Sequence, residues 1–245
     1  MDILYIYKDD GYDGLSLRYS LRGIDLYGLN VNNVYVVGDK CTWFSDKVHY
    51  IPFKQKFDCY EEPGKNIALA IKTAIDNSNI SEEFLVSMDD HFYTKPTDFD
   101  NYPIYVKNYK NRSYGYMLPE ACESGGEYEM YLVVTGALLR QHNMTTYMFA
   151  PHRNMHLSKT LFNECWDDIQ SAFSTYAGVE SIVWCLNYAY TKEPFDFTVV
   201  EDVKFGNNSN FIIPDNVFST RDFKPGDKLD VFLKKLYSNK SKFEL

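Results

Sequence analysis

Short apolar runs and longer amphipathic stretches alternate through the first half of the chain. Four apolar runs are each a few residues long and end at polar or turn-forming positions, so they predict buried strands at residues 2–7, 34–37, 48–51 and 84–88. Two stretches between them carry apolar side chains at helical spacing, which predicts helices at residues 16–28 and 63–77. Ser16 is the expected N-cap of the first helix, and Gly28 is its expected stop. Strands that alternate with helices in this way predict an α/β fold with a mainly parallel central sheet and flanking helices.

The second half of the chain is less regular. Helical spacing and N-cap signals predict further helices at residues 131–142, 158–173, 178–190 and 227–237, and residues 197–213 alternate like strands. No repeat, low-complexity tract or linker divides the chain, so we expect a single domain over residues 1–245.

Composition and charge narrow the function classes. The formal net charge of −9 provides no global positive field for nucleic acid or anionic lipid, although a local basic patch, and with it a nucleic-acid acceptor, stays open. Aromatic residues make up 17% of the chain, which suits core packing or sugar stacking. The five cysteines show no CxxC pair, the start is too short and too acidic for a signal peptide, and no apolar run reaches the ~20 residues of a membrane span. We therefore expect a cytoplasmic protein with reduced thiols and no membrane span.

Acidic residues follow three of the predicted strands, as Asp9-Asp10, Asp39 and Asp89-Asp90. In open parallel sheets the ligand lies beyond the carboxyl ends of the strands. Carboxylate oxygens suit Mg²⁺ or Mn²⁺, and such a cation neutralises a leaving nucleoside diphosphate. We therefore predict that Asp89 and Asp90 hold a divalent cation against a donor diphosphate, with ordinary turn residues as the alternative interpretation.

Basic and imidazole side chains add to this hypothesis. Arg18 and Arg22 lie four residues apart on the first predicted helix, so both guanidinium groups can reach one phosphate; the alternative is a solvated helix face. His91, directly after the acidic pair, is a candidate third metal ligand or donor contact. We also expect Tyr5 and Asn66 to contact the donor.

Three segments of the first half resemble one known family. Residues 17–24 (LRYSLRGI), 34–39 (VYVVGD) and 84–92 (FLVSMDDHF) follow the order of the second conserved region of the Stealth sugar-phosphotransferase family, and the opening strand resembles that family's first motif. A later segment is similar to another family block, with His152 at its start, Lys159 and Glu164 downstream, and Glu180 placed like the acidic residue that follows. The resemblance implies that His152 is the catalytic base and that Glu180 orients it or contacts the donor.

Two positions depart from the family pattern. Ala177 stands where the family has arginine, and Asn154 stands where it has proline. These departures argue against sugar-phosphate transfer and leave the use of a nucleotide sugar standing. The segments 218–222 (FSTRD) and 240–244 (KSKFE) resemble the closing signature of small bacterial and phage glycosyltransferases of the GT-A type, which implies a GT-A-like fold for the whole chain.

The first functional hypothesis is a glycosyltransferase that moves a sugar from a nucleoside-diphosphate donor, with UDP favoured, to a hydroxyl of a glycan or other acceptor. In it, Asp89 and Asp90 hold Mn²⁺ or Mg²⁺, Asp39 binds uridine or ribose, and His152 deprotonates the acceptor. The donor-binding half of the domain would span residues 1–95, and the acceptor and catalytic half residues 96–245. Transfer of sugar-1-phosphate is the alternative, and a non-catalytic nucleotide- or sugar-binding protein is the third reading. The loop at residues 123–129 is either a lid or a plain connection. Glu127 in that loop is the substitute base if His152 is not the base.

Overall fold

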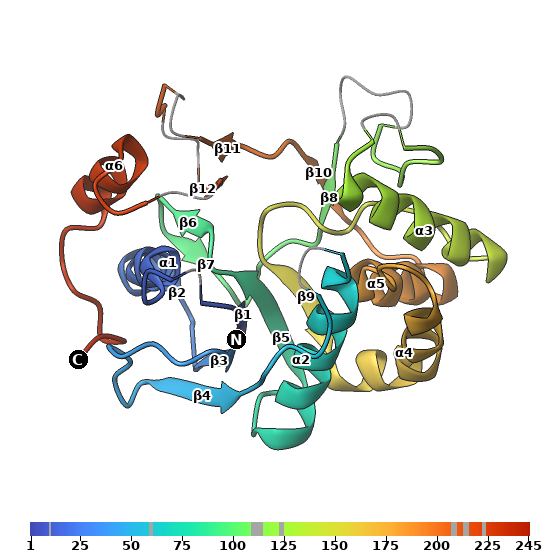
Figure 1. The fold of residues 1–245 in the computed structure, drawn as a ribbon, viewed down its shortest axis with the longest axis horizontal. Helices are drawn as coiled ribbons and strands as arrows, with labels where there is room; N and C mark the ends of the chain where they lie inside the picture. Colours follow the sequence, from blue (N-terminus) through green and yellow to red (C-terminus); the bar gives the residue numbers. More distant parts are fainter. Residues whose placement is uncertain are drawn as a thin grey trace.

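A five-stranded sheet in the order β4-β3-β1-β5-β9 forms the centre of the molecule (Figure 1). Its strands are β1 (Asp2–Tyr7), β3 (Val34–Gly38), β4 (Val48–Pro52), β5 (Glu83–Met88) and β9 (Met155–Ser158). The first four are parallel to one another, whereas β9 runs antiparallel to β5. This computed structural model describes residues 1–9, 11–58, 61–108, 115–122, 125–206, 210–212, 216–221 and 224–245.

Helices flank the sheet, and short strands lie around it. The helices are α1 (Leu15–Tyr27), α2 (Pro63–Asn77), α3 (Glu127–Gln141), α4 (Lys159–Ser171), α5 (Ser181–Lys192) and α6 (Lys228–Leu236), with a 3-10 turn, η1 (Ala172–Ser174), after α4. Among the short strands, β2 (Gly28–Leu29) pairs with β7 (Thr97–Asp98), and β8 (Tyr105–Lys107) pairs with β10 (Thr198–Val200). A small sheet places β12 (Val217–Thr220) between β6 (His91–Tyr93) and β11 (Lys204–Phe205).

The two faces of the central sheet are buried against different helices. Successive side chains of a strand point to opposite faces. Leu4 of β1 and Val86 of β5 therefore pack with residues of α2, α4 and α5, whereas Ile3 and Leu85 pack with residues of α1. Figure 1 shows α1 and α2 on opposite sides of the sheet. The observed layers explain why the first-half strands are almost wholly apolar.

The order of the strands creates a switch point between β1 and β5. From β1 the chain passes through α1 to β3 and β4 on one side, and α2 then carries it back to β5 on the other side of β1. The connection that follows β1 enters α1, whereas the connection that follows β5 continues into β6, so β1 and β5 are the neighbouring strands at which the strand order changes direction. The segments that begin at Lys8 and Asp89 follow the carboxyl ends of these two strands.

The predicted fold class is confirmed: the protein is a mixed α/β domain with a mainly parallel central sheet and flanking helices. Strand β9 comes from the second half of the chain and pairs with β5 of the first half, so both halves share one sheet. Among the described residues, no helix is both long enough and apolar enough to cross a membrane.

The predicted N-cap of the first helix is wrong. Helix α1 begins at Leu15 after Gly14, whose φ of 67° favours glycine. A Cβ at Gly14 would lie 2.5 Å from the Sγ of Cys41, so a larger residue does not fit there. The hydroxyl of Ser16 is thereby left to bond Asp89 instead of capping the helix.

Two helix starts in the second half also differ from the prediction. Helix α3 begins at Glu127, so part of the predicted loop is helical, and the glutamates of its first turn suit the positive end of the helix. Helix α5 begins at Ser181 rather than at Gly178. The strand-like stretch at 197–213 contains β10 and β11, while residues 123, 124, 207–209 and 213 lie outside the described residues.

A buried ion pair ties α1 to the C-terminal segment. Arg22 donates from Nε and Nη2 to the two carboxylate oxygens of Glu244 at 2.7 and 2.8 Å, and from Nη1 to the carbonyl of Tyr237. The Glu244 side chain is only 3% exposed. Burial raises the pKa of Glu244, but the bonds from Arg22 and from Ser241 outweigh burial and hold that pKa below its usual range. The guanidinium of Arg22, predicted to bind phosphate, is thus committed to a structural pair.

We expect Arg22→Ala to lower the free energy of unfolding by about 3 kcal/mol, because it leaves the buried carboxylate of Glu244 without its partner. Urea denaturation at neutral pH measures the loss. The matched control is Lys242→Ala, which removes an exposed ion pair with Asp25 and should cost less than about 1 kcal/mol. Equal losses in the two variants would contradict a special role for the buried pair.

Candidate active site

Hydrogen bonds tie the residues that follow β1, β3 and β5 to neighbouring segments. The hydroxyl of Ser16, in the first turn of α1, donates to the carboxylate of Asp89. Asp39, after β3, accepts a hydrogen bond from the backbone N–H of Asp9 at 2.9 Å. Asp9 and Asp39, two of the acidic strand ends, are therefore in contact, Asp89 contacts the first turn of α1, and Asp10 lies outside the described residues.

Arg18, on α1, lies beside two carboxylates and an aromatic ring. Its guanidinium packs over the ring of Trp43 at 4.8 Å and lies 4.0 Å from the carboxylate of Asp13 and 3.9 Å from that of Glu244. These ion pairs are long, and the side chain is 30% exposed. Arg18 therefore keeps donors that can reach a ligand, and its predicted phosphate contact stays a prediction.

The antiparallel direction of β9 brings a second set of residues to the Asp89-Asp90 turn. Met155, the first residue of β9, pairs with Val86 near the end of β5. The residues just before β9, His152 to Asn154, must therefore lie near the carboxyl end of β5. Proximity between His152 and Asp90 follows from the strand pairing.

His152 and Asp202 form a hydrogen-bonded dyad. The Nδ1 of His152 lies 2.8 Å from Oδ2 of Asp202, and the backbone N–H of His152 donates to Oδ1 at 3.0 Å. Because a carboxylate only accepts, this contact places the proton on Nδ1 and leaves the lone pair on Nε2. The predicted base thus has the tautomer that a general base needs.

Lys107 holds the other side of the dyad. Its ammonium lies 2.9 Å from the carboxylate of Asp202, which is 7% exposed. Burial raises the pKa of Asp202, but the hydrogen bond from His152 and the charge of Lys107 outweigh burial and bring that pKa well below its usual range. Asp202 therefore stays ionised at neutral pH and fixes the orientation of His152.

Lys204 bridges the dyad and the acidic turn. Its Nζ lies 3.4 Å from Nε2 of His152 and 3.5 Å from Oδ2 of Asp90. We call the group of Asp90, His91, Lys107, His152, Asn154, Asp202 and Lys204 the His152 cluster. It draws side chains from the β5–β6 turn, β6, β8, the loop before β9, the segment after β10, and β11.

His91 forms the buried floor of the His152 cluster. Its side chain is 1% exposed, with Nε2 3.8 Å from Asp90 and Nδ1 3.4 Å from the backbone N–H of Met88. Burial lowers the pKa of His91 to about 4, against a smaller opposing effect of Asp90. The imidazole is therefore neutral at pH 7.

Two buried polar side chains next to this floor have unused hydrogen-bonding capacity. Asn154 lies beside the imidazole of His91 and is 1% exposed, yet within the described residues neither atom of its amide makes a hydrogen bond of normal geometry. The Oγ of Ser219 is likewise buried and without a described partner. Ser219 pairs with both His91 and Lys204 in the small sheet, so the three side chains share one face.

The three predicted metal ligands do not form a ready-made site. Across the described part of the chain, no group of three or more His, Cys, Asp or Glu side chains is arranged to hold a metal ion. Asp89 is bonded by Ser16, Asp90 lies near Lys204, and His91 is buried. Asp89 and Asp90 still offer adjacent carboxylates of the type that Mg²⁺ accepts together with substrate phosphates and water.

Tyr5 and Asn66, the next two predicted donor contacts, are both buried and bonded within the protein. Tyr5 is 0% exposed, and its hydroxyl lies 2.8 Å from that of Ser20; burial raises the pKa of Tyr5 to about 12. Asn66 bonds the backbone of Lys56 and Phe57 through its amide. A direct donor contact by Tyr5 is inconsistent with its full burial, and Asn66, at 3% exposed, orders the loop before α2.

Glu180 does not orient His152, because Asp202 holds that position. Glu180 lies at the start of α5, where its Oε2 is 3.4 Å from the hydroxyl of Tyr131 and its backbone N–H donates to Thr135. Burial raises the pKa of Glu180 to about 7, against the smaller effects of bonds from the backbone of Ile182 and from Tyr131. The predicted contact between Glu180 and the donor stays a prediction.

Sequence reasoning missed Asp202, Lys107 and Lys204. All three lie in short strands or loops far along the chain from His152, and their spacing follows no motif. The alternation of apolar and polar residues in 197–213 predicted strands there, but it did not predict that Asp202 and Lys204 contact His152. Asn154 was visible only as a departure from the family pattern.

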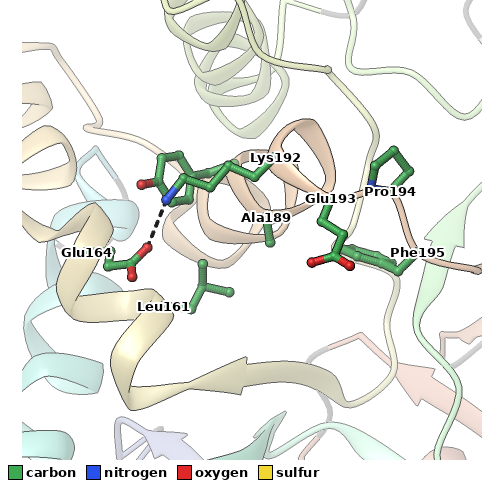
Figure 2. Close-up of a pocket in the computed structure, with 8 residues that line it drawn as sticks. Leu161, Glu164, Ala189, Lys192, Glu193, Pro194 and Phe195 are labelled. Atoms are coloured by element: carbon green, nitrogen blue, oxygen red, sulfur yellow. Dashed lines mark hydrogen bonds and ion pairs between the residues drawn. The ribbon is translucent and has the colours of Figure 1, made fainter.

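A separate hollow lies between α4 and α5. It is lined by Leu161, Glu164, Tyr188, Ala189, Lys192, Glu193, Pro194 and Phe195 (Figure 2). Glu164, which belongs to the segment that resembles the Stealth pattern, pairs here with Lys192 at 3.1 Å. This hollow contains no member of the His152 cluster.

The buried carboxyl of Glu180 makes stability depend on pH. A carboxyl whose folded pKa is raised to about 7 favours folding while it is protonated, and this contribution is lost as pH rises from its unfolded value of 4.5 through about 7. We expect the free energy of unfolding of the native chain, relative to Glu180→Gln, to fall by roughly 1–3 kcal/mol between pH 5 and 8. Urea denaturation across that range is the measurement, and a constant difference would contradict the buried carboxyl.

Comparisons with known proteins add little to this geometry. No protein-family model matches the chain, and no curated protein matches it. Solved structures similar to the chain include a galactosyltransferase, LgtC, in complex with donor and acceptor sugar analogues, at 11% identity and a TM-score of 0.49 over 97% of this chain and 95% of that one. An active-site mutant of LgtC gives 10% identity and a TM-score of 0.48 over the same shares. Likeness at this level assigns neither family nor activity. The resemblance to the Stealth family is not supported by a match to a family model.

Proposed function

We propose that the protein is a glycosyltransferase with a GT-A-like arrangement, which transfers a sugar from a nucleoside-diphosphate donor to a hydroxyl group. UDP-sugars are the favoured donors, and a glycan is the favoured acceptor. The observation that carries the proposal is the His152–Asp202 dyad, placed beside Asp90 at the switch point of a parallel sheet. A base whose lone pair is on Nε2, next to a carboxylate turn, suits the deprotonation of a hydroxyl near a diphosphate.

In the proposed reaction, Nε2 of His152 takes the proton of the acceptor hydroxyl. The acceptor oxygen forms a bond to the anomeric carbon of the sugar, and the bond from that carbon to the diphosphate oxygen breaks. The electron pair of the broken bond leaves on the diphosphate. Asp202 stabilises the imidazolium that results, because it is ionised and bonded to Nδ1.

Buried polar groups support a hydroxyl-rich ligand at this site. The amide of Asn154 and the hydroxyl of Ser219 are buried and, within the described residues, make no hydrogen bond of normal geometry, which is costly unless a ligand or water supplies partners. Sugar hydroxyls both donate and accept, so they can pair with an amide and a serine together. We assign Asn154 and Ser219 to recognition of a sugar ring.

Asp89 and Asp90 are the residues that would hold a divalent cation. A bound Mg²⁺ or Mn²⁺ would neutralise charge on the leaving diphosphate. The adjacent carboxylates fit this use, because Mg²⁺ commonly takes one or two carboxylates and completes its coordination with phosphate oxygens and water. Ser16 would fix the carboxylate of Asp89, and Arg18 would approach the phosphates from α1.

A thermal-shift screen of nucleotide sugars with and without Mn²⁺ tests the proposal, because a ligand that binds the native state raises its apparent stability. We expect UDP-sugars to raise the melting temperature, and incubation with hydroxyl acceptors to release UDP. Release of UMP would identify sugar-phosphate transfer instead. Binding without turnover on any acceptor would indicate a binding protein, and no shift with any nucleotide would refute the use of a nucleotide sugar.

Replacement of the dyad should separate chemistry from binding. We expect His152→Ala to lower kcat by about 10²- to 10⁴-fold with UDP affinity retained, because the base is lost. Asp202→Asn keeps the shape but removes the charge that stabilises the imidazolium of His152, so kcat should fall by at least about tenfold. Steady-state kinetics and calorimetry of UDP binding measure both.

His142→Ala is the control for the loss of a histidine, because the side chain of His142 is exposed and packs edge-on against Trp184 outside the His152 cluster. It should leave kcat unchanged. Full activity of His152→Ala would exclude His152 as the base.

A further inference from the structure

Lys204 contacts both Asp90 and His152, the two side chains that the proposed reaction needs. Its ammonium lies 3.5 Å from the carboxylate of Asp90 and 3.4 Å from Nε2 of His152. An ammonium group only donates, so its contact with His152 uses the lone pair that would accept the proton of the acceptor. In the free protein, the base is therefore blocked by a side chain of the same chain.

The two lysines of the His152 cluster differ in how firmly they are held. Lys107 lies 2.9 Å from Asp202, and the two side chains are 16% and 7% exposed. Lys204 makes longer contacts, is 35% exposed, and belongs to β11, a strand of two residues at the edge of the small sheet. Lys204 is thus the cation that can exchange partners, while Lys107 is fixed to the buried carboxylate.

A diphosphate is a stronger partner for Lys204 than the single carboxylate of Asp90, because it brings more negative charge and more acceptor oxygens. We propose that Lys204 couples donor binding to activation of the base: it masks His152 and Asp90 in the free protein and moves onto the diphosphate when the donor binds. This inference rests on the proposed function. Movement of Lys204 frees Nε2 of His152 for the acceptor and frees Asp90 for a cation, so activation of the acceptor follows arrival of the donor.

The position of Ser219 agrees with such a movement. Ser219 lies between His91 and Lys204 on one face of the small sheet, and its buried Oγ has no partner within the described residues. Displacement of the lysine that flanks it would give this hydroxyl access to the ligand. The same motion would therefore uncover the base and a sugar-recognition group.

Lys204→Met tests the proposal through two affinities that should change in opposite directions. Without nucleotide, Mn²⁺ should bind Lys204→Met at least about tenfold more tightly than the native chain, because the ammonium no longer competes at Asp90. Without metal, UDP should bind Lys204→Met about tenfold more weakly, the loss expected for one charge-assisted hydrogen bond. Electron paramagnetic resonance of free Mn²⁺ and titration calorimetry with UDP provide the two readouts, and Lys204→Arg should restore most of the UDP affinity.

The matched control is Lys192→Met, which removes a lysine that is also paired with a carboxylate, that of Glu164, but outside the His152 cluster. Both affinities should stay at native values in this control. If the native chain binds UDP and Lys204→Met changes neither affinity, or lowers both together, the role of Lys204 is refuted while the proposed function stands. If the native chain does not bind UDP at all, the proposed function fails, and the role of Lys204 fails with it.

Discussion

Strand β1 has hydrogen-bonded neighbours on both edges, β3 on one side and β5 on the other, and the site depends on this pairing. The register places Tyr7 beside Gly38 and Ile6 beside Met88, so three strands end at nearly the same level. A Cβ at Gly38 would lie 1.8 Å from the carbonyl oxygen of Tyr7, so this close approach requires glycine. The alignment of strand ends places Asp9, Asp39 and Asp89 just beyond the same edge of the sheet.

The direction of β9 brings residues of the second half of the chain to the carboxyl end of β5. An antiparallel strand begins where its neighbour ends, so β9 delivers His152 and Asn154 to the Asp89-Asp90 turn. In the small sheet, too, antiparallel pairing joins the two halves of the chain, because β12 runs antiparallel to β6 and places Ser219 opposite His91. Neither half of the chain holds the base, its carboxylate partner and the acidic turn by itself.

The sequence predicted the first half of the fold well and the site only in part. Periodicity identified β1, β3, β4, α2 and β5, because each buries apolar side chains in a pattern that local spacing reveals. Ser16 was misplaced because its role depends on Asp89, which lies 73 residues away in the chain. Asp202 was missed for the same reason: its contact with His152 spans 50 residues and leaves no local signature. Contacts of this kind come from the pairing of short strands, which is decided by tertiary packing rather than by propensity.

Burial divides the charges of the His152 cluster into a fixed part and an exchangeable part. Asp202 and Lys107 are both largely buried and make short contacts, so separating them would leave an uncompensated charge in a poorly solvated position. Asp90 and Lys204 are 23% and 35% exposed and farther apart, so water can solvate either one when the pair separates. The same chemistry of carboxylate and ammonium thus gives a rigid pair at Asp202 and an exchangeable pair at Asp90. In a protein with net charge −9, a cation held by a partly exposed carboxylate is a local positive charge that an anionic ligand can attract away from that carboxylate.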